Sequence, residues 1–263
     1  FRTPWILANT NNTTAFAGLG YSVENKKDIN GHIVLGCSHI YSSNGEGLKY
    51  KLAKISNDKI QWRHKKPHLC YDDAYEFGKS IVNLFYESMN ELPKRVVIHK
   101  RTFYTDEEKQ GIIDSISDNK KIESIDLIEI NFENNIKYAS SKIHDGKVDI
   151  DGFSVSRGTC IQLSSKEALL WAHGVIPSVI NPNWNFYPGG RYIPKPLRII
   201  KHYGTGSLEQ IANEILGLTK MNWNSLNMYS QLPATISSSN DIARIGKLIG
   251  ANSMHEYDYR YFI

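Results

Sequence analysis

The segment Leu218–Gly250 reads LTKMNWNSLNMYSQLPATISSSNDIARIGKLIG, and it joins an asparagine-rich part to the last amphipathic stretch of the chain. A Leu232-Pro233 pair separates the two parts. Serine and asparagine just ahead of an apolar periodic run are typical N-cap residues. The run Ser237–Asp241 therefore predicts the start of a final helix, with unpaired backbone N–H groups near Asn240. A helix start of this kind is a site for an anion.

Motifs in a fixed order connect this segment with the rest of the chain. They are Arg157-Gly158-Thr159, LTKMNWNS (218–225), LPAT (232–235), SSSNDIARIG (237–246) and the closing YRYFI (259–263). In this order and spacing they resemble the PIWI domain of a prokaryotic Argonaute, of the short or otherwise catalytically inactive type. The resemblance runs from about Pro4 to the C-terminus, which is essentially the whole chain.

The bulk composition is that of a soluble globular protein. Of the 263 residues 41% are hydrophobic and 22% are charged, and no apolar run approaches the roughly 18 residues of a membrane-spanning helix. A net charge of +4 permits a polyanionic partner without requiring one. The three cysteines have no CxxC spacing, so neither a disulfide framework nor a zinc site is indicated, and a cytoplasmic location is expected.

Local patterns predict an α/β class. Three strands at 15–23, 33–41 and 48–55 form an antiparallel meander, and helices starting at Asp72 and Asp106 alternate with buried strands at 96–99 and 125–132. Further on, the patterns predict hairpins at Asp145-Gly146 and Asp151-Gly152, strands at 157–163 and 168–173, a loop at 177–196 and a helix over 208–216. This order implies a mixed sheet with helices on both faces.

The resemblance names that architecture as the RNase H-like fold of PIWI domains. It also implies a division of the chain, with residues 1–14 as a lead-in from a preceding MID domain and residues 15–263 as the PIWI domain. Since the chain has no initiator Met, we expect it to begin inside a longer polypeptide.

A cleaving PIWI domain holds two metal ions with several carboxylates, because both the entering and the leaving oxygen must lie against positive charge. The resemblance aligns three of these positions with Gly20, Arg101 and Asn240, or with Thr102 in place of Arg101 if the register slips by one. None of them offers a carboxylate. The remaining carboxylate, a mobile glutamate in the family, has only a weak counterpart in Glu46.

Magnesium prefers hard anionic oxygens, so these residues predict no catalytic metal pair and no cleavage. The alternative is a guide-directed nuclease with a rearranged metal site, in which Asp241 serves as a ligand. Other enzyme motifs such as GxSxG, a P-loop or HExxH are absent from the sequence. His99, on a buried strand, is expected to be a hydrogen-bonded core histidine.

The resemblance implies contacts with a guide strand and its target along the remaining motifs. The predicted guide- and target-binding residues are the cations Arg157, Lys220, Arg244 and Lys247 and the neutral donors Thr159, Asn222, Asn224 and Ser225. Contacts of this kind to phosphates set register and affinity without reading sequence. An ordinary loop at 222–227 and a solvated helix face at Arg244 remain open as alternatives.

The aromatic tail 257–263 is expected to dock on the protein. In Argonautes the C-terminal carboxylate, here that of Ile263, helps to hold Mg²⁺ at the 5′-phosphate of the guide together with the MID domain. Simple apolar burial of the tail is the alternative.

These expectations combine into one function. The resemblance implies an inactive PIWI domain that binds a guide RNA and single-stranded target DNA and signals to a partner effector. That effector would carry an APAZ segment with a sirtuin-like, TIR or nuclease domain and act in defence against phage or plasmids, in the first two cases by depleting NAD. A domain that only scaffolds protein partners is a further alternative.

Overall fold

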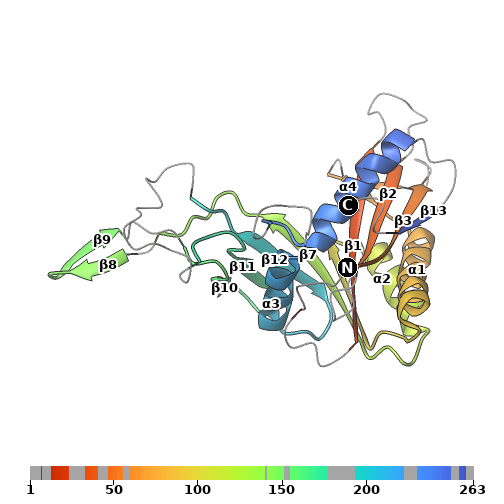
Figure 1. The fold of residues 1–263 in the computed structure, drawn as a ribbon, viewed down its shortest axis with the longest axis horizontal. Coiled ribbons are helices and arrows are strands. Elements are labelled where there is room, and N and C mark those ends of the chain that lie inside the picture. Colours follow the sequence, from red (N-terminus) through yellow and green to blue (C-terminus); the bar gives the residue numbers. More distant parts are fainter. Residues whose placement is uncertain are drawn as a thin grey trace.

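The computed structural model describes residues 7, 13–23, 33–40, 47–55, 60–64, 66–139, 141–150, 155–176, 193–221, 230–249 and 255–258. Within this part of the chain a nine-stranded mixed sheet runs in the order β10-β11-β12-β7-β6-β1-β2-β3-β13 (Figure 1). Its strands are β1 (Thr14–Val23), β2 (Ile33–Ile40), β3 (Gly47–Ile55), β6 (Arg95–Lys100), β7 (Ser124–Phe132), β10 (Cys160–Gln162), β11 (Glu167–Leu170), β12 (Leu197–Tyr203) and β13 (His255–Asp258). The α/β class and the mixed sheet predicted from the sequence are confirmed.

The first three strands form the predicted antiparallel meander. Strands β1, β6 and β7 then pair in parallel, with α1 (Tyr71–Met89) preceding β6 and α2 (Asp106–Ser117) joining β6 to β7. Parallel strands need such crossover connections, and the carboxyl ends of the joined strands meet at one edge of the sheet. This edge positions the candidate site.

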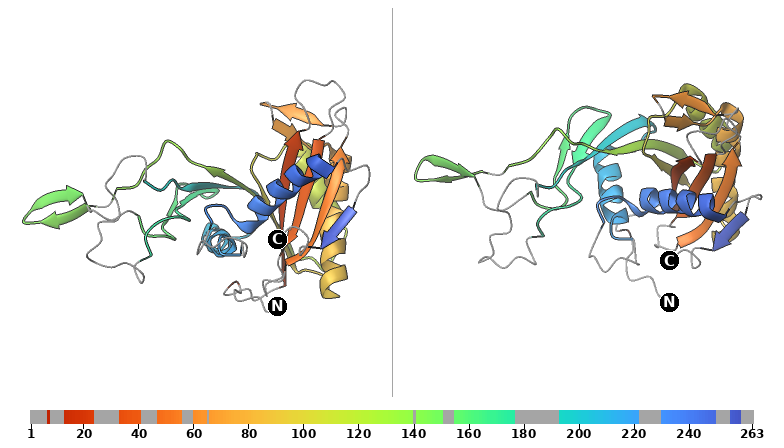
Figure 2. Two further views of the ribbon diagram at one scale, coloured as in Figure 1. Left: turned by 45° about the horizontal axis from the view of Figure 1, so that its top comes forward. Right: turned by 90° about the horizontal axis from the view of Figure 1, so that it is seen from above.

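The sheet is covered on both faces, as predicted. Alternate residues of β1 and β6 point to opposite sides. Ala17 and Ile98 belong to the core beneath α1 and α2, whereas Phe16 and Val97 belong to the core beneath α3 (Leu208–Leu218) and α4 (Ala234–Ile249). Figure 2 shows α4 crossing the face of β1 and β2 that is opposite to α1.

Two hairpins lie outside the large sheet. One consists of β4 (Gln61–Arg63) and β5 (Lys66–His68), and the other of β8 (Ser141–His144) and β9 (Lys147–Ile150). The second extends away from the sheet (Figures 1 and 2), and its turn is the predicted Asp145-Gly146 pair, both with positive φ. The Asp151-Gly152 turn lies outside the described residues.

The predicted start of the last helix was wrong. Helix α4 begins at Ala234, and the carbonyl of Pro233 accepts its first backbone bonds. The serines of the 237–239 run lie inside the helix, where their hydroxyls donate to carbonyls three or four residues earlier. A serine hydroxyl can donate to a backbone carbonyl in this way inside a helix, and it can also cap the start of a helix. The anion site predicted at Asn240 from unpaired N–H groups therefore does not exist there.

The strand predicted at 157–163 is shorter than expected. The backbone turns at Ser156 to Gly158, where Gly158 has φ +93°, and the strand occupies only Cys160–Gln162. The strand predicted at 168–173 is found as Glu167–Leu170, and most of the loop predicted at 177–196 lies outside the described residues. Among the helices that the structure describes, none combines the length and apolar character needed to cross a bilayer.

Candidate functional site

The structure brings Gly20 and the backbone of Asn240 together, and Arg101 directly follows the strand that pairs with β1. In the parallel pairing of β1 with β6, Leu19 lies opposite Lys100, so the next residue of each strand, Gly20 and Arg101, lies at the shared carboxyl edge. Helix α4 crosses β1 here, and the backbone nitrogen of Asn240 lies 2.8 Å from the point where a Cβ on Gly20 would lie. Gly20 and the Asn240 backbone are thus in close contact, and the assignment of all three positions to one site stays a prediction.

Gly20 has no room for a side chain. A Cβ on this residue would lie 2.7 Å from both the carbonyl carbon and the carbonyl oxygen of Ser239. Ser239 is itself fully buried, since it faces the sheet from the middle of α4. The close approach of helix and strand therefore depends on glycine at residue 20.

Arg101 extends over the end of the neighbouring strand. Its side chain is half-buried, and its guanidinium carbon lies 5.5 Å from the centre of the Phe132 ring at the end of β7. A guanidinium over an aromatic face is an attractive cation–π arrangement. In the described part of the chain, no carboxylate pairs with it.

These residues do not fit a pair of divalent metal ions. Gly20 offers no donor, Asn240 offers a neutral amide and Arg101 carries a fixed positive charge, whereas Mg²⁺ prefers anionic oxygens. Asp241, the alternative ligand, is exposed and forms an ion pair with Arg244 at 3.2 Å. Glu46 lies outside the described residues. Within the described ranges no group of three or more His, Cys, Asp or Glu side chains is placed to hold a metal.

A buried ion pair that the sequence did not reveal lies directly beneath this edge. Lys100 is fully buried, and its Nζ lies 2.6 and 2.7 Å from the two carboxylate oxygens of Glu108. Glu108 also accepts from the backbone N–H of Leu69 at 2.8 Å and of Thr105 at 3.1 Å. The pair ties β5, β6 and the start of α2 together.

The charge of Glu108 is stabilised by these partners. Burial alone would raise its pKa, but the hydrogen bond with His68 and the charge and hydrogen bond of Lys100 outweigh burial and lower the pKa to about 2. The Thr105-x-x-Glu108 spacing is a capping-box signal, and both of its hydrogen bonds are present. That signal could have predicted the capping role of Glu108, but not its contact with Lys100.

His99 is the hydrogen-bonded core histidine that the sequence predicted. It is fully buried, and its Nδ1 lies 2.9 Å from the hydroxyl of Thr235 in the first turn of α4. Burial, and to a smaller extent the charge of Arg95, lower its pKa to about 3. The imidazole is therefore neutral at pH 7 and ties β6 to α4.

Arg157 and Thr159 lie at the turn before β10, close to the end of α3. The Arg157 guanidinium donates to the Leu216 carbonyl at 3.1 Å and to the Thr219 hydroxyl at 2.6 Å. The Thr159 hydroxyl donates to the Ser156 carbonyl at 2.8 Å. Arg157 thus helps to close the C-terminus of α3, just before Lys220, which is half-buried. This side chain has a structural role that the motif did not indicate.

The other predicted contact residues are described only in part. Arg244 is exposed on α4, and Lys247 belongs to the same helix, but its side chain lies outside the described residues. Asn222, Asn224, Ser225 and Ile263 also lie outside the described residues, so the guide loop and the metal site at the C-terminal carboxylate remain predictions.

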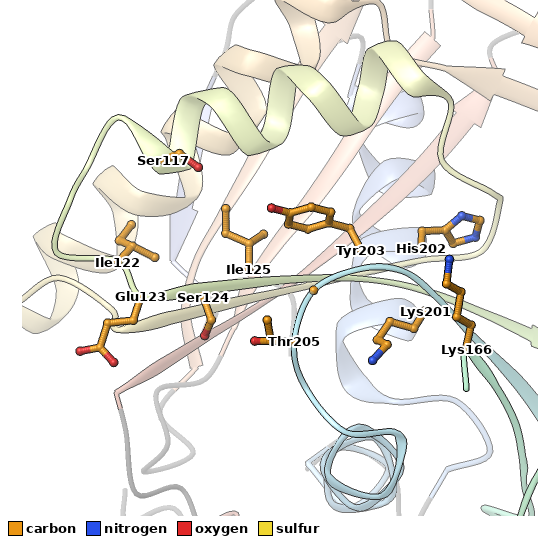
Figure 3. Close-up of a pocket in the computed structure, with 11 residues that line it drawn as sticks. Ser117, Ile122, Glu123, Ser124, Ile125, Lys166, Lys201, His202, Tyr203 and Thr205 are labelled. Carbon is orange, nitrogen blue, oxygen red and sulfur yellow. The ribbon is translucent and has the colours of Figure 1, made fainter. Parts of the chain in front are cut away.

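A cavity of about 450 Å³ lies at the beginning of β7 and the end of α2, away from the edge that holds Arg101 (Figure 3). Its basic side chains are Lys166, Lys201 and His202. The Lys201 ammonium donates to the Gly206 carbonyl at 2.8 Å, and the His202 ring lies 2.8 Å from a Glu129 oxygen. Two of the three basic groups are thus held by the protein, and none of the residues predicted for guide, target or metal lines this cavity.

No protein-family model and no curated protein sequence matches the chain. Its structure is similar to that of Aquifex aeolicus Argonaute, with a TM-score of 0.61 and 19% identity over 96% of this chain and 31% of that chain. It is also similar to Clostridium butyricum Argonaute bound to a guide DNA and a 19-mer target DNA, with a TM-score of 0.65 and 18% identity over 99% of this chain and 30% of that chain.

A third similar structure is Marinitoga piezophila Argonaute in complex with a 5′ OH guide RNA and target DNA. The TM-score is 0.58, and the identity is 16% over 92% of this chain and 32% of that chain. The chain thus spans about a third of the length of these proteins. At these identities the similarity establishes a shared fold, the PIWI-like fold of Argonautes.

Proposed function

We propose that this chain, which has the PIWI-like fold of Argonautes, binds a small guide strand and a complementary single-stranded DNA without cutting either. The observation that carries the proposal is the contact of the Ser239 backbone with Gly20, together with the guanidinium of Arg101, which follows the neighbouring strand β6. A carboxylate side chain at residue 20 would collide with α4 in this arrangement, and the resemblance assigns the fixed positive charge of Arg101 to a position where a cleaving site holds a metal ligand.

The cations that remain support binding. Arg101 and Arg244 project from the end of β6 and from α4, and the exposed Arg63 and Lys66 lie on the β4–β5 hairpin. Cations of this kind neutralise phosphates and release counterions, which supplies affinity that does not depend on sequence. Two of the similar solved structures contain both a guide and a target strand, and in one of them the guide is RNA. We take RNA as the guide of this chain as well.

The rest of the proposal follows from the resemblance alone. A MID domain in the same polypeptide would complete the pocket for the guide 5′-phosphate, with Mg²⁺ held by the carboxylate of Ile263. Target recognition would be passed to an APAZ-containing effector with a sirtuin-like, TIR or nuclease domain. Any enzymatic activity would then belong to that effector, in defence against phage or plasmids.

The direct experiment is to incubate the guide-loaded protein with an end-labelled complementary DNA strand and Mg²⁺ or Mn²⁺. We expect stable binding and an uncut strand. Cleavage at one defined position that is lost in Asp241→Ala would instead favour the nuclease with a rearranged site. Cleavage that persists in this variant would be assigned to a contaminant.

A salt series tests binding itself. Phosphate contacts require the affinity for the labelled strand to fall steeply between about 50 and 200 mM salt. An affinity that does not change with salt, or no binding at all, would favour a domain that only scaffolds protein partners.

A further inference from the structure

Arg101 is a cation without a counter-ion in the described part of the chain. Its side chain is half-buried, and its contact is the ring of Phe132, which is attractive but carries no net charge. Partial burial removes water that would otherwise stabilise the guanidinium, and buried charges in proteins are ordinarily paired. The position therefore calls for an anion that the described residues do not supply.

The residues next to Arg101 leave its charge uncompensated. Lys100 is neutralised by Glu108 within a closed, buried pair on the other face of the sheet. His99, which contacts Thr235 of α4, is neutral at pH 7 because burial lowers its pKa to about 3. The net charge of His99, Lys100, Arg101 and Glu108 taken together is thus that of the Arg101 guanidinium.

The β4–β5 hairpin adds further positive charge near this edge. Its turn residue His64 has its ring 6.1 Å from that of Phe103, two residues after Arg101. The exposed side chains of Arg63 and Lys66 flank this turn, and Trp62 on the same hairpin is 45% exposed. Exposed cations near this edge attract a phosphate backbone whatever its sequence.

We propose that the Arg101 guanidinium binds one backbone phosphate of the guide–target duplex, at the edge where β1 and β6 end. A guanidinium matches a phosphate through two parallel N–H···O bonds, which fixes the register of a strand as well as adding affinity. The inference rests on the proposed function, because it assumes that a nucleic acid lies across this edge. It assigns to Arg101 a positioning role that replaces cleavage at this edge.

The test uses neutral linkages in place of single phosphates. Guide and target strands, each with one methylphosphonate at successive positions, are bound to the guide-loaded protein, and the dissociation constant is measured by fluorescence anisotropy. We expect one linkage, or two adjacent ones, to weaken binding by about tenfold in the wild-type protein, which corresponds to one strong charged contact. The strand in which this linkage lies identifies which backbone Arg101 contacts.

Variants of Arg101 assign the effect. In Arg101→Gln the affinity for the unmodified duplex should fall by about tenfold, and the sensitive linkage should lose its effect. Arg101→Lys should recover part of the lost affinity, because the charge returns without the bidentate geometry. Arg63→Gln is the matched control, since it removes a cation near the same edge and should leave the sensitive linkage unchanged.

The outcomes separate the two proposals. If the wild-type protein binds the duplex and the same linkages matter in Arg101→Gln, or if none matters, the assignment of Arg101 is overturned while the binding function stands. If the wild-type protein binds no guide or target, both proposals fail together. The linkage scan on the wild-type protein needs no variant. If no linkage weakens binding there, the assignment of Arg101 is overturned even when Arg101→Gln folds poorly.

Discussion

The backbone of Ser239 in α4 lies against Gly20 in β1 so closely that a Cβ at residue 20 would be 2.7 Å from the Ser239 carbonyl carbon. Neither backbone segment can move independently, since Gly20 belongs to a central strand and Ser239 to a helix packed across it. A carboxylate side chain at residue 20 would therefore clash with α4 unless the helix moved away from β1.

We predict that Gly20→Ala lowers the free energy of unfolding by about 1–3 kcal/mol, because the added methyl group displaces α4. Urea unfolding measures this change. Gly146→Ala is the comparison, since its φ of +73° disfavours alanine but its Cβ would meet nothing within 4 Å, and its cost should be roughly 1 kcal/mol. A Gly20→Ala protein as stable as the wild type would show that α4 is not held against β1 as described.

The same contact should prevent two substitutions from creating a cleaving site. The double variant Gly20→Asp/Asn240→Asp should not cut a guided target in Mg²⁺ or Mn²⁺, because the Arg101 charge remains and α4 obstructs the new carboxylate. Gel analysis of the end-labelled strand measures this. Cleavage at one position by the double variant would mean that two substitutions suffice to rebuild a metal centre.

Removal of only one partner of the Lys100–Glu108 pair should strongly destabilise the protein. Lys100→Met leaves the Glu108 carboxylate buried without its cation, and we expect a loss of about 3–5 kcal/mol in the free energy of unfolding. Lys109→Met is the matched control, because Lys109 pairs at 2.7 Å with an Asp106 carboxylate that is 99% exposed. It should change stability little, since exposed pairs are screened by water.

Stability should depend on pH through His99. Its pKa is about 3 in the folded protein and near 6.5 when unfolded, so the unfolded state takes up the proton first as the pH falls. The contribution of His99 to stability is fully present above about pH 6.5 and is lost progressively as the pH falls to about 3. Between pH 7 and pH 5 the expected loss is about 2 kcal/mol, at 1.36 kcal/mol per pKa unit.

Urea unfolding of His99→Gln at the two pH values checks this assignment. The difference between pH 7 and pH 5 should shrink by most of that amount in this variant. His64→Asn, which removes an exposed histidine, should leave the difference unchanged. An equal pH dependence in the wild type and in His99→Gln would contradict the assignment to this side chain.

The cation of Arg244 should contribute to binding of the phosphate backbone. In Arg244→Gln the slope of log affinity against log salt concentration should become shallower by about one, equally for targets of different sequence. Asp241→Asn removes the partner carboxylate and should not weaken binding. If Arg244→Gln leaves the salt slope unchanged, Arg244 belongs to a solvated helix face, which was the alternative from the sequence.

Much of the fold could be predicted because its signals are local. Local sequence patterns predicted the meander of β1, β2 and β3, and Asp106 was predicted as the start of the helix that the structure shows as α2. The start of α4 could not be predicted correctly, since the serines at 237–239 are compatible with either a helix cap or a helix interior. Packing of Ser239 against β1 decides between the two.

By itself, the sequence determined the order of strands and helices and which residues stand at positions 20, 101 and 240, because both depend on residue type and spacing along the chain. Only the tertiary structure decided that the Ser239 backbone fills the space beside Gly20, that Lys100 pairs with Glu108 and that Arg157 closes α3. These contacts join residues on different elements, and their burial and distances arise only when the sheet and its helices pack together.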